Sequence, residues 1–185
     1  MPKKSFYKNY FEIFKSKISF SEEIFRKMEK VEKLILNVKR NNKKILIFGN
    51  GGSAAIASHF SIDCNNKLKV RCLNFNEASI LTCYSNDYGY ENWVKKALEQ
   101  FSENGDLVIF ISSSGESKNM INGSKFLKKK RIKAITLTGF NKKNSLQKIG
   151  GINIWINSKI YNFIENSHQL ILLSIIDSLS NIKIK

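Results

Sequence analysis

Residues 43–63, KKILIFGNGGSAAIASHFSID, constrain the fold of this chain more than any other stretch. Residues 45–48 form a short apolar run that predicts a buried strand. The run stops at residues 49–52, Gly-Asn-Gly-Gly, where glycine allows positive φ and brings bare backbone close to a ligand. Ser53 is a suitable N-cap for a helix over residues 54–60. Strand, glycine turn and helix start together offer free N–H groups and a helix dipole to an anion.

The same stretch limits which ligand the chain can bind. Its glycine spacing matches neither GxGxxG nor a Walker loop, which argues against a nucleotide site. His59 and Asp63 lie four residues apart on the predicted helix, so both side chains point to one side of it. A glycine turn that only joins a strand to a helix is the alternative interpretation.

Apolar and amphipathic segments alternate along the rest of the chain. Strands are predicted at residues 45–48, 69–75, 107–111, 132–138 and 152–156. Helices are predicted at residues 20–40, 54–60, 79–84 and 91–102, after the serine-rich run up to residue 130, and at 161–180. Residues 85–89 are expected to form a polar loop, and residues 139–148 a loop with a short helix. The alternation predicts an α/β fold, a single-domain, doubly wound, five-stranded parallel sheet of flavodoxin-like type, flanked by helices.

Two of the predicted strands end in loops of small polar residues, at residues 49–53 and 112–117. In parallel sheets, ligands bind beyond the carboxyl ends of the strands, near the point where strand order reverses. If the first and third strands are neighbours, the two loops meet at one site. The second loop offers hydroxyls and backbone donors at a helix start, which suits a phosphate without any lysine. A serine-rich N-cap is the alternative interpretation of this loop.

The first 40 residues are expected to form an arm and an oligomerisation helix, while residues 43–180 form the α/β core of one domain that spans residues 1–185. Residues 1–18 are aromatic and basic and predict an irregular arm or a helix. Residues 20–40 predict an amphipathic helix capped near Ser19 or Ser21. Its apolar stripe consists of Ile24, Met28, Val31, Ile35 and Val38. The stripe suits packing on the chain's own sheet or on the same helix of another subunit, and its spacing does not choose between them.

Composition narrows the class of partner. The net charge is +16, but only four of the 31 basic residues are arginine and the lysines are spread along the chain. We therefore expect a solvated surface and no nucleic-acid partner. The longest apolar run near the end, residues 170–173, is too short to span a bilayer. The odd number of cysteines (Cys64, Cys72 and Cys83), without metal or redox spacing, and the lack of a secretory signal predict a cytoplasmic protein.

Three short motifs carry a resemblance to a known family. They are GNGGS at residues 49–53 followed by His59, the pair Asn86 and Asp87, and ISSSGES at residues 111–117. In this order and at these separations, the chain resembles the sugar isomerase (SIS) domain. It is closest to the sedoheptulose 7-phosphate isomerases (phosphoheptose isomerases) of bacterial heptose synthesis. The resemblance reaches to about residue 180 and implies a homotetramer that holds a phosphosugar between subunits.

The resemblance also implies which residues bind the substrate. Ser112, Ser114 and Ser117 would hold the phosphate, while Asn50, Ser53 and Asp87 would contact the sugar. The full expected set is Asn50, Gly51, Gly52, Ser53, Asn86, Asp87, Ser112, Ser113, Ser114 and Ser117.

The family's zinc site is only partly preserved. Zinc in the family is bound by a histidine and a glutamate on the first core helix and by a glutamine and a histidine on the last. At those positions this chain has His59, Asp63, Glu165 and Leu173. The histidine matches, the two carboxylates replace a longer carboxylate and an amide, and Leu173 can neither bind metal nor move a proton. The expected ligands of a divalent metal such as zinc are therefore His59, Asp63 and Glu165.

Aldose–ketose isomerisation needs groups that remove a proton from one carbon and return it to the next. The expected catalytic residues are Asp63, Glu165 and His168. His168 lies three residues after Glu165, on the same face of the last helix. A hydrogen-bonded core or interface histidine is the alternative interpretation of His168.

Two functions follow from this pattern. The first is a phosphosugar isomerase that converts sedoheptulose 7-phosphate to D-glycero-D-manno-heptose 7-phosphate for bacterial surface polysaccharide. The alternative is a non-catalytic SIS module that binds a phosphosugar or a protein partner, like the replication-initiator-associating relatives. His59 with two carboxylates favours the enzyme, and Leu173 favours the binding module. A sugar-responsive transcription regulator is a weak third hypothesis, because about 40 residues before the first strand leave too little room for a helix-turn-helix and a linker.

Overall fold

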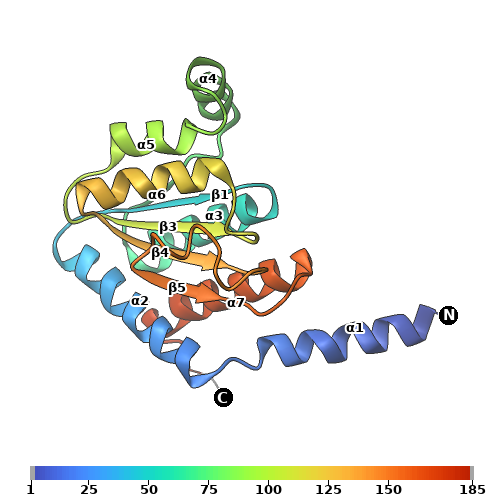
Figure 1. The fold of residues 1–185 in the computed structure, drawn as a ribbon. Helices are drawn as coiled ribbons and strands as arrows, with labels where there is room; N and C mark the ends of the chain where they lie inside the picture. The colour runs from blue at the N-terminus through green and yellow to red at the C-terminus, as the bar shows by residue number, and fades with distance from the viewer. Residues whose placement is uncertain (1–2, 184–185) are drawn as a thin grey trace.

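The computed structural model describes residues 3–183 (Figure 1). Its sheet has five strands in the order β2-β1-β3-β4-β5, and all neighbours are parallel. The strands are β1 (Ile45–Gly49), β2 (Cys72–Asn74), β3 (Leu107–Ser112), β4 (Lys133–Thr138) and β5 (Ile152–Trp155). The helices are α1 (Lys3–Ile18), α2 (Glu22–Arg40), α3 (Gly52–Asp63), α4 (Ala78–Tyr88), α5 (Trp93–Phe101), α6 (Lys118–Lys130) and α7 (Tyr161–Leu179), with a π-helix η1 (Cys64–Leu68) after α3. The predicted α/β class and the five-stranded parallel sheet are confirmed.

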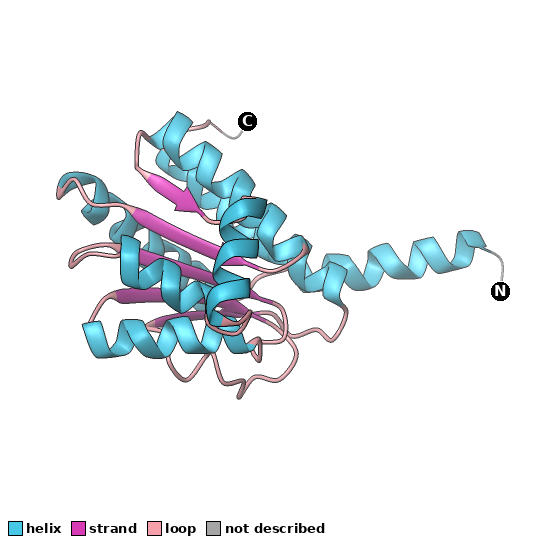
Figure 2. Cartoon of the chain, turned by 90° about the horizontal axis from the view of Figure 1, so that it is seen from above, coloured by secondary structure: helices cyan, strands magenta, loops and turns pink. Residues whose placement is uncertain are grey.

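Helices cover both faces of the sheet (Figure 2), and the central strands β1 and β3 are buried along their whole length. Successive side chains of β1 alternate between two cores, as the pleat of a strand requires. Ile45 and Ile47 join the core under α2, α3 and α7. Leu46 and Phe48 join the core under α5 and α6. Burial on both faces explains why the strands appear in the sequence as unbroken apolar runs.

The apolar stripe of α2 packs on the chain's own sheet. Val31, Ile35 and Val38 are buried in the core with β5 and α7, and Ile24 and Met28 pack against its rim. This contact decides between the two alternatives left by the sequence. The helix begins after Ser21, as predicted, although the Ser21 side chain makes no capping hydrogen bond.

Helix α1 extends away from the body of the protein (Figures 1 and 2). None of its residues is buried. Its contact with the core is aromatic: Tyr10 meets the ring of Phe163 edge to face at 4.6 Å between centroids, and Phe14 lies 5.3 Å from the same ring. Phe6 and Phe11, which pack beside the Tyr10 ring, remain more than 60% exposed (62% and 63%).

Two helix boundaries differ from the sequence predictions. Ser53 is not an N-cap: the cap of α3 is Gly51, with φ of 53°, and Ser53 lies inside the first turn. The prediction missed this because the N–H of Ser53 already bonds to the carbonyl of Asn50, which starts the helix earlier. The loop predicted at residues 85–89 is also wrong, since α4 continues to Tyr88 and ends at Gly89, with φ of 82°. Only the first half of α4 packs on the core, through Ile80, Leu81 and Tyr84, so its exposed polar end resembled a loop.

Two other elements are shorter than predicted. Strand β2 covers only residues 72–74 of the expected 69–75, because Lys69, with φ of 54°, ends η1 and the N–H of Val70 still bonds to the carbonyl of Cys64. The Asn65 side chain then bonds to both the N–H (3.2 Å) and the carbonyl (2.7 Å) of Cys72, on the edge strand of the sheet. Residues 139–148 form turns with no helix in them.

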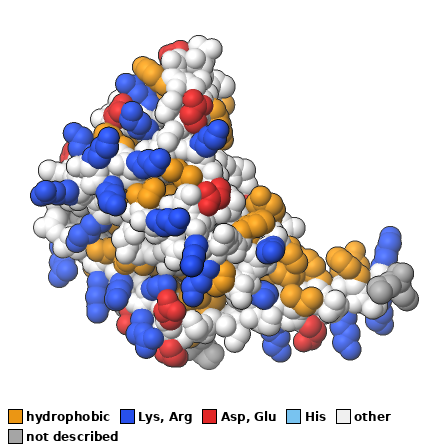
Figure 3. All heavy atoms as spheres, viewed as in Figure 1, with side chains coloured by type: hydrophobic (Ala, Val, Ile, Leu, Met, Phe, Trp, Pro, Cys, Tyr) orange, Lys and Arg blue, Asp and Glu red, His pale blue; other side chains and the backbone are white. Residues whose placement is uncertain are grey.

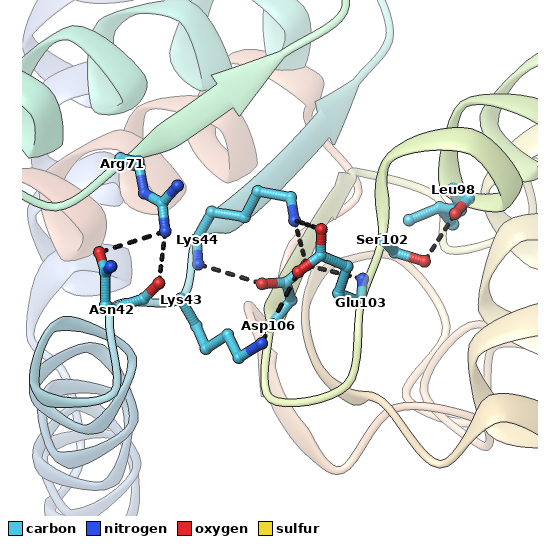
Figure 4. A network of polar contacts seen from close by, with 8 residues as sticks. All are labelled: Asn42, Lys43, Lys44, Arg71, Leu98, Ser102, Glu103 and Asp106. Carbon is cyan, nitrogen blue, oxygen red and sulfur yellow. Dashed lines mark hydrogen bonds and ion pairs between the residues drawn. The ribbon is translucent and has the colours of Figure 1, made fainter.

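A buried carboxylate anchors the amino ends of the central strands (Figure 4). The side chain of Asp106 is fully buried just before β3 and pairs with the Lys44 ammonium at 2.8 Å. It also accepts hydrogen bonds from the backbone N–H of Lys44 (3.1 Å) and Glu103 (2.8 Å). A buried charge with a partner and this many donors avoids the cost of an isolated one. Within residues 3–183, no helix is both long and apolar enough to cross a membrane.

Candidate functional site

The two polar loops meet at one edge of the sheet. Strand β1 pairs with β2 on one side and with β3 on the other, so strand order reverses between β1 and β3. Gly49, the first residue of one loop, and Ile111, the residue before the other, are register partners. The first and third strands are therefore neighbours, and the loops at residues 49–53 and 112–117 lie side by side.

Between the loops lies a cavity of ≈ 110 Å³. Six of the predicted substrate-binding residues line it: Asn50, Ser53, Ser112, Ser113, Ser114 and Ser117. Helix α7 adds Tyr161 and Glu165. The lining, taken from the described part of the chain, contains no lysine or arginine. A negatively charged group in this cavity would be bound by hydroxyls, amides and helix starts.

The serine loop is held in a tight turn at the start of α6. Gly115, with φ of 67°, donates its N–H to the carbonyl of Ser112 at 3.0 Å. The hydroxyl of Ser114 accepts the N–H of Glu116 at 3.2 Å. Ser117 is the N-cap of α6, but its hydroxyl makes no capping bond and lies 3.3 Å from the Ser112 hydroxyl. Two hydroxyls therefore converge at a helix start, where a phosphate is favoured.

Ser113 has unused hydrogen-bonding capacity. Its side-chain oxygen is buried and has no hydrogen-bond partner within residues 3–183, although Ser113 lines the cavity. Its carbonyl accepts the N–H of Gly139 at 2.8 Å, which fixes the loop against the end of β4. Buried hydroxyls in proteins are normally paired, so a ligand oxygen is a fitting partner for Ser113.

Glu165 brings a carboxylate to the cavity from the first turns of α7. Its side chain lies against Gly52, at the start of α3, where a Cβ would collide with it. Tyr161, one turn earlier on the same face, was missed by the sequence analysis; its ring lies 4.9 Å from that of Phe140. The signal was available, since a side chain four residues before a site residue shares its helix face.

Asp63 does not lie at this cavity. It ends α3, which has 12 residues, so it is about 16 Å along the helix from Gly52. Its carboxylate pairs with Lys67 at 2.9 Å and lies 3.8 Å from Nε2 of His59. Within residues 3–183 no group of three or more His, Cys, Asp and Glu side chains is placed to hold a metal ion. His59 and Asp63 are thus together in one protomer, but Glu165 is not with them.

His168 is a core residue in this structure. It is completely buried, and its Nε2 lies 3.2 Å from the carbonyl oxygen of Thr138, at the end of β4. A carbonyl can only accept, so Nε2 carries the proton. Burial lowers the pKa of His168 to about 4, so the ring is neutral near pH 7. Because His168 does not line the cavity, the geometry favours the alternative of a core histidine over a catalytic one.

Asn86 and Asp87 lie near the end of α4, which stands at one extreme of the molecule (Figure 1). The Asn86 amide donates to Asp87 at 3.0 Å, and the Cys83 thiol donates to the same carboxylate at 3.6 Å. All three side chains are exposed, and none lines the cavity of its own chain.

The surface charge agrees with the composition. On the face drawn in Figure 3, lysine and arginine side chains are scattered among neutral and acidic ones over the whole body of the protein. Scattered lysines are typical of a solvated surface, as the sequence predicted.

Comparisons with known proteins agree on one family. A family model described as "SIS domain" matches residues 9–139. The phosphoheptose isomerase of Sulfurimonas denitrificans is 36% identical over 170 residues, which cover 89% of this chain and 86% of that protein. The phosphoheptose isomerase of Fusobacterium nucleatum is 31% identical over 183 residues, covering 96% of this chain and 93% of that one.

Solved structures give the same fold. A phosphoheptose isomerase from Neisseria gonorrhoeae superposes with a TM-score of 0.87 at 24% identity, covering 97% of this chain and 99% of that one. One from Francisella tularensis gives a TM-score of 0.89 at 24% identity, with coverage of 97% and 98%. At this identity the structural likeness speaks for the fold alone.

Proposed function

This chain belongs to the SIS domain family, and from that premise we propose that it is a phosphosugar aldose–ketose isomerase acting on sedoheptulose 7-phosphate. Its product would be D-glycero-D-manno-heptose 7-phosphate. The observation that carries the proposal is that one cavity is lined both by the hydroxyls of the serine loop, which can bind a phosphate, and by the carboxylate of Glu165. Relatives aligned along nearly the full chain are named phosphoheptose isomerase.

The serine loop would hold the phosphate. The hydroxyls of Ser112, Ser114 and Ser117 and the N-terminus of α6 provide neutral donors and a helix dipole at the end of β3. A phosphate bound there fixes one end of an open-chain sugar. The other end then extends toward Asn50, Tyr161 and Glu165, which complete the lining of the cavity.

Glu165 would move the proton. It takes a proton from C1 of the ketose, which leaves an enediol, and returns it to C2, while a second proton passes from the C1 oxygen to the C2 oxygen. No electrons are exchanged with another molecule. Tyr161, which lines the same cavity, would donate to an oxygen that gains charge in this step. Asp63 and His168, expected as catalytic residues from the sequence, receive no step, because neither lines the cavity of its own chain.

A divalent metal such as zinc would polarise the substrate carbonyl if it were bound near that oxygen. His59, Asp63 and Glu165 do not fit such an ion as one set within a protomer, since Glu165 lies at the opposite end of α3 from Asp63. The mechanism above therefore assigns no step to a metal. Metal binding stays a prediction.

Assembly into an oligomer would bring to the cavity residues that lie outside it in a single chain. We propose a homotetramer in which α1 packs its exposed aromatic residues on another copy. Asp87 on α4 would then reach the cavity of a neighbour, as the family resemblance implies. The free thiols of Cys64 and Cys72, both buried, suit the cytoplasm as the proposed compartment.

The direct test is to incubate the purified protein with sedoheptulose 7-phosphate and follow the aldoheptose phosphate by NMR. Glu165→Gln is the matched control, because it keeps the shape of the side chain and removes the base. We expect product from the wild type and a loss of at least about 100-fold in the variant. Sugar binding without turnover, with or without added divalent ions, would instead identify a binding module.

A further inference from the structure

Asn119 joins the two loops that form the cavity. It lies in the first turn of α6 and is only 2% exposed. Its amide and that of Asn50 exchange two hydrogen bonds: Asn50 Nδ2 donates to Asn119 Oδ1 at 3.1 Å, and Asn119 Nδ2 donates to Asn50 Oδ1 at 2.9 Å. Asn50 follows β1 and Asn119 follows the serine loop, so this pair connects the switch-point loops side chain to side chain.

One backbone donor fixes the orientation of both amides. The N–H of Met120 bonds to Asn119 at 3.0 Å, and a backbone N–H can only donate, so the atom that faces it is Oδ1. The other end of the Asn119 amide is then Nδ2, which must meet the oxygen of Asn50. Tyr90, from the segment between α4 and α5, adds a further hydrogen bond from its hydroxyl to Asn50 Oδ1 at 3.2 Å.

These contacts leave Asn50 with one kind of hydrogen-bonding capacity. Its oxygen already accepts from Asn119 and Tyr90, which occupies both lone pairs. Its nitrogen has given one hydrogen to Asn119 and keeps a second. Since Asn50 lines the cavity, the group it offers to a ligand is a single N–H donor.

We propose that Asn119, assisted by Tyr90, is a positioning residue that presents Asn50 to the substrate as an N–H donor only. The ligand atom that meets Asn50 is then an acceptor, such as the carbonyl oxygen of an open-chain sugar, and a group that can only donate is rejected. This inference rests on the proposed function, because it assigns the sugar end of the phosphosugar to Asn50. The phosphate end is held by other residues.

A double-mutant cycle in binding tests the proposal. Asn50→Ala, Asn119→Ala and the double variant are titrated by calorimetry with sedoheptulose 7-phosphate and, separately, with inorganic phosphate. Each single change should weaken sugar phosphate binding by about tenfold. The double variant should be no weaker than Asn50→Ala, because Asn119 acts through Asn50. Phosphate affinity should stay within about twofold in all three.

Two further variants separate positioning from simple stability. Asn122→Ala removes an amide one turn later on α6, which donates to the carbonyl of Glu91 at 2.9 Å, and should leave sugar binding unchanged. Tyr90→Phe keeps an exposed ring and removes one donor to Asn50, and should weaken sugar binding by a few-fold without lowering the melting temperature.

Additive losses in the double variant, or an equal loss of phosphate affinity in Asn119→Ala, would overturn the proposal. The cycle uses binding, so it stays decisive for a wild-type protein that binds the sugar without turning it over. Failure of the positioning role and failure of the isomerase function are therefore distinguishable.

Discussion

The carboxylate of Glu165 lies directly against the backbone of Gly52: a Cβ built at residue 52 would stand 2.4 Å from Oε2 of Glu165. Real Cβ atoms do not approach an oxygen this closely, so one of the two groups would have to move. The start of α3 and the start of α7 are thus matched to each other, and glycine at position 52 lets the carboxylate reach the cavity.

Gly52→Ala should therefore impair catalysis without unfolding the protein. Alanine is favoured in a helix, so the melting temperature should hold or rise. The displaced carboxylate should lower kcat by at least about tenfold, in the direction of the larger loss in Glu165→Gln. Ala55→Ser, which adds one atom on the exposed face of α3, is the matched control. Unchanged kcat in a folded Gly52→Ala protein would contradict a catalytic carboxylate at this position.

If the serine loop binds the phosphate, removing its hydroxyls should lower the affinity for the sugar phosphate. Combined Ser114→Ala and Ser117→Ala changes should weaken sugar phosphate binding by about 1–3 kcal/mol, because ligand oxygens lose their donors. Calorimetry with sedoheptulose 7-phosphate measures the effect. Ser174→Ala, on the exposed side of α7, should leave the affinity unchanged. Full affinity in the double variant would rule out this loop as the phosphate site.

His168 makes stability depend on pH. Its pKa is about 4 in the folded protein and near the ordinary 6.5 when unfolded. Between these two pH values, the unfolded state binds a proton that the native state does not bind. This contribution is fully present above pH 6.5 and is lost as pH falls toward 4. Between pH 6.5 and 5, the free energy of unfolding should drop by about 1.5 kcal/mol from this residue. Urea denaturation of His168→Gln should show a drop smaller by that amount; equal drops would contradict a buried neutral histidine.

The sheet and the position of the site were predictable because they depend on local patterns. Apolar runs bounded by glycine located β1 and β3, and the polar residues after each strand located the cavity once the strands were neighbours. The family resemblance then supplied Asn50, Ser53 and the serines, all of which line the cavity.

The predictions that failed concern residues whose positions depend on how the helices pack against one another. Glu165 meets the first turn of α3 while Asp63 ends that helix, and no spacing within either helix specifies how α3 and α7 align. Asn86 and Asp87 were expected in a loop and lie in α4, because the last turn of this helix is exposed and carries no apolar residue that packs on the core. Asn119 was missed because its role lies in a long-range pair with Asn50.

Exposed aromatic residues on α1 predict association. Light scattering at micromolar concentration should give about four times the chain mass of 21.3 kDa. Phe6→Glu combined with Phe11→Glu replaces two exposed aromatic residues of α1 with charges and keeps the contacts of Tyr10 and Phe14 with Phe163. The variant should form smaller species with unchanged circular dichroism. Ile182→Glu, also an exposed apolar residue, is the control. A monomeric wild type would refute the tetramer.

A substitution at Leu173 tests whether the protein binds a metal ion. It is half-buried on α7 and stands where the family has a histidine ligand. Leu173→His should raise zinc affinity by on the order of tenfold, whereas turnover should stay unchanged, because the mechanism assigns no step to a metal. Metal content by atomic emission and activity with and without a chelator measure the two effects, and thermal unfolding checks the fold. A folded variant that does not gain zinc would exclude a metal site at this position.

The buried Asp106 lies at the amino ends of the strands, and the cavity lies beyond their carboxyl ends. The ion pair with Lys44 and its hydrogen bonds to the backbone do not involve any residue that lines the cavity. Mutations at one edge of the sheet therefore act nearly independently of those at the other. Evolution can therefore exchange polar residues of the cavity without weakening the ion pair that anchors the opposite edge of the sheet.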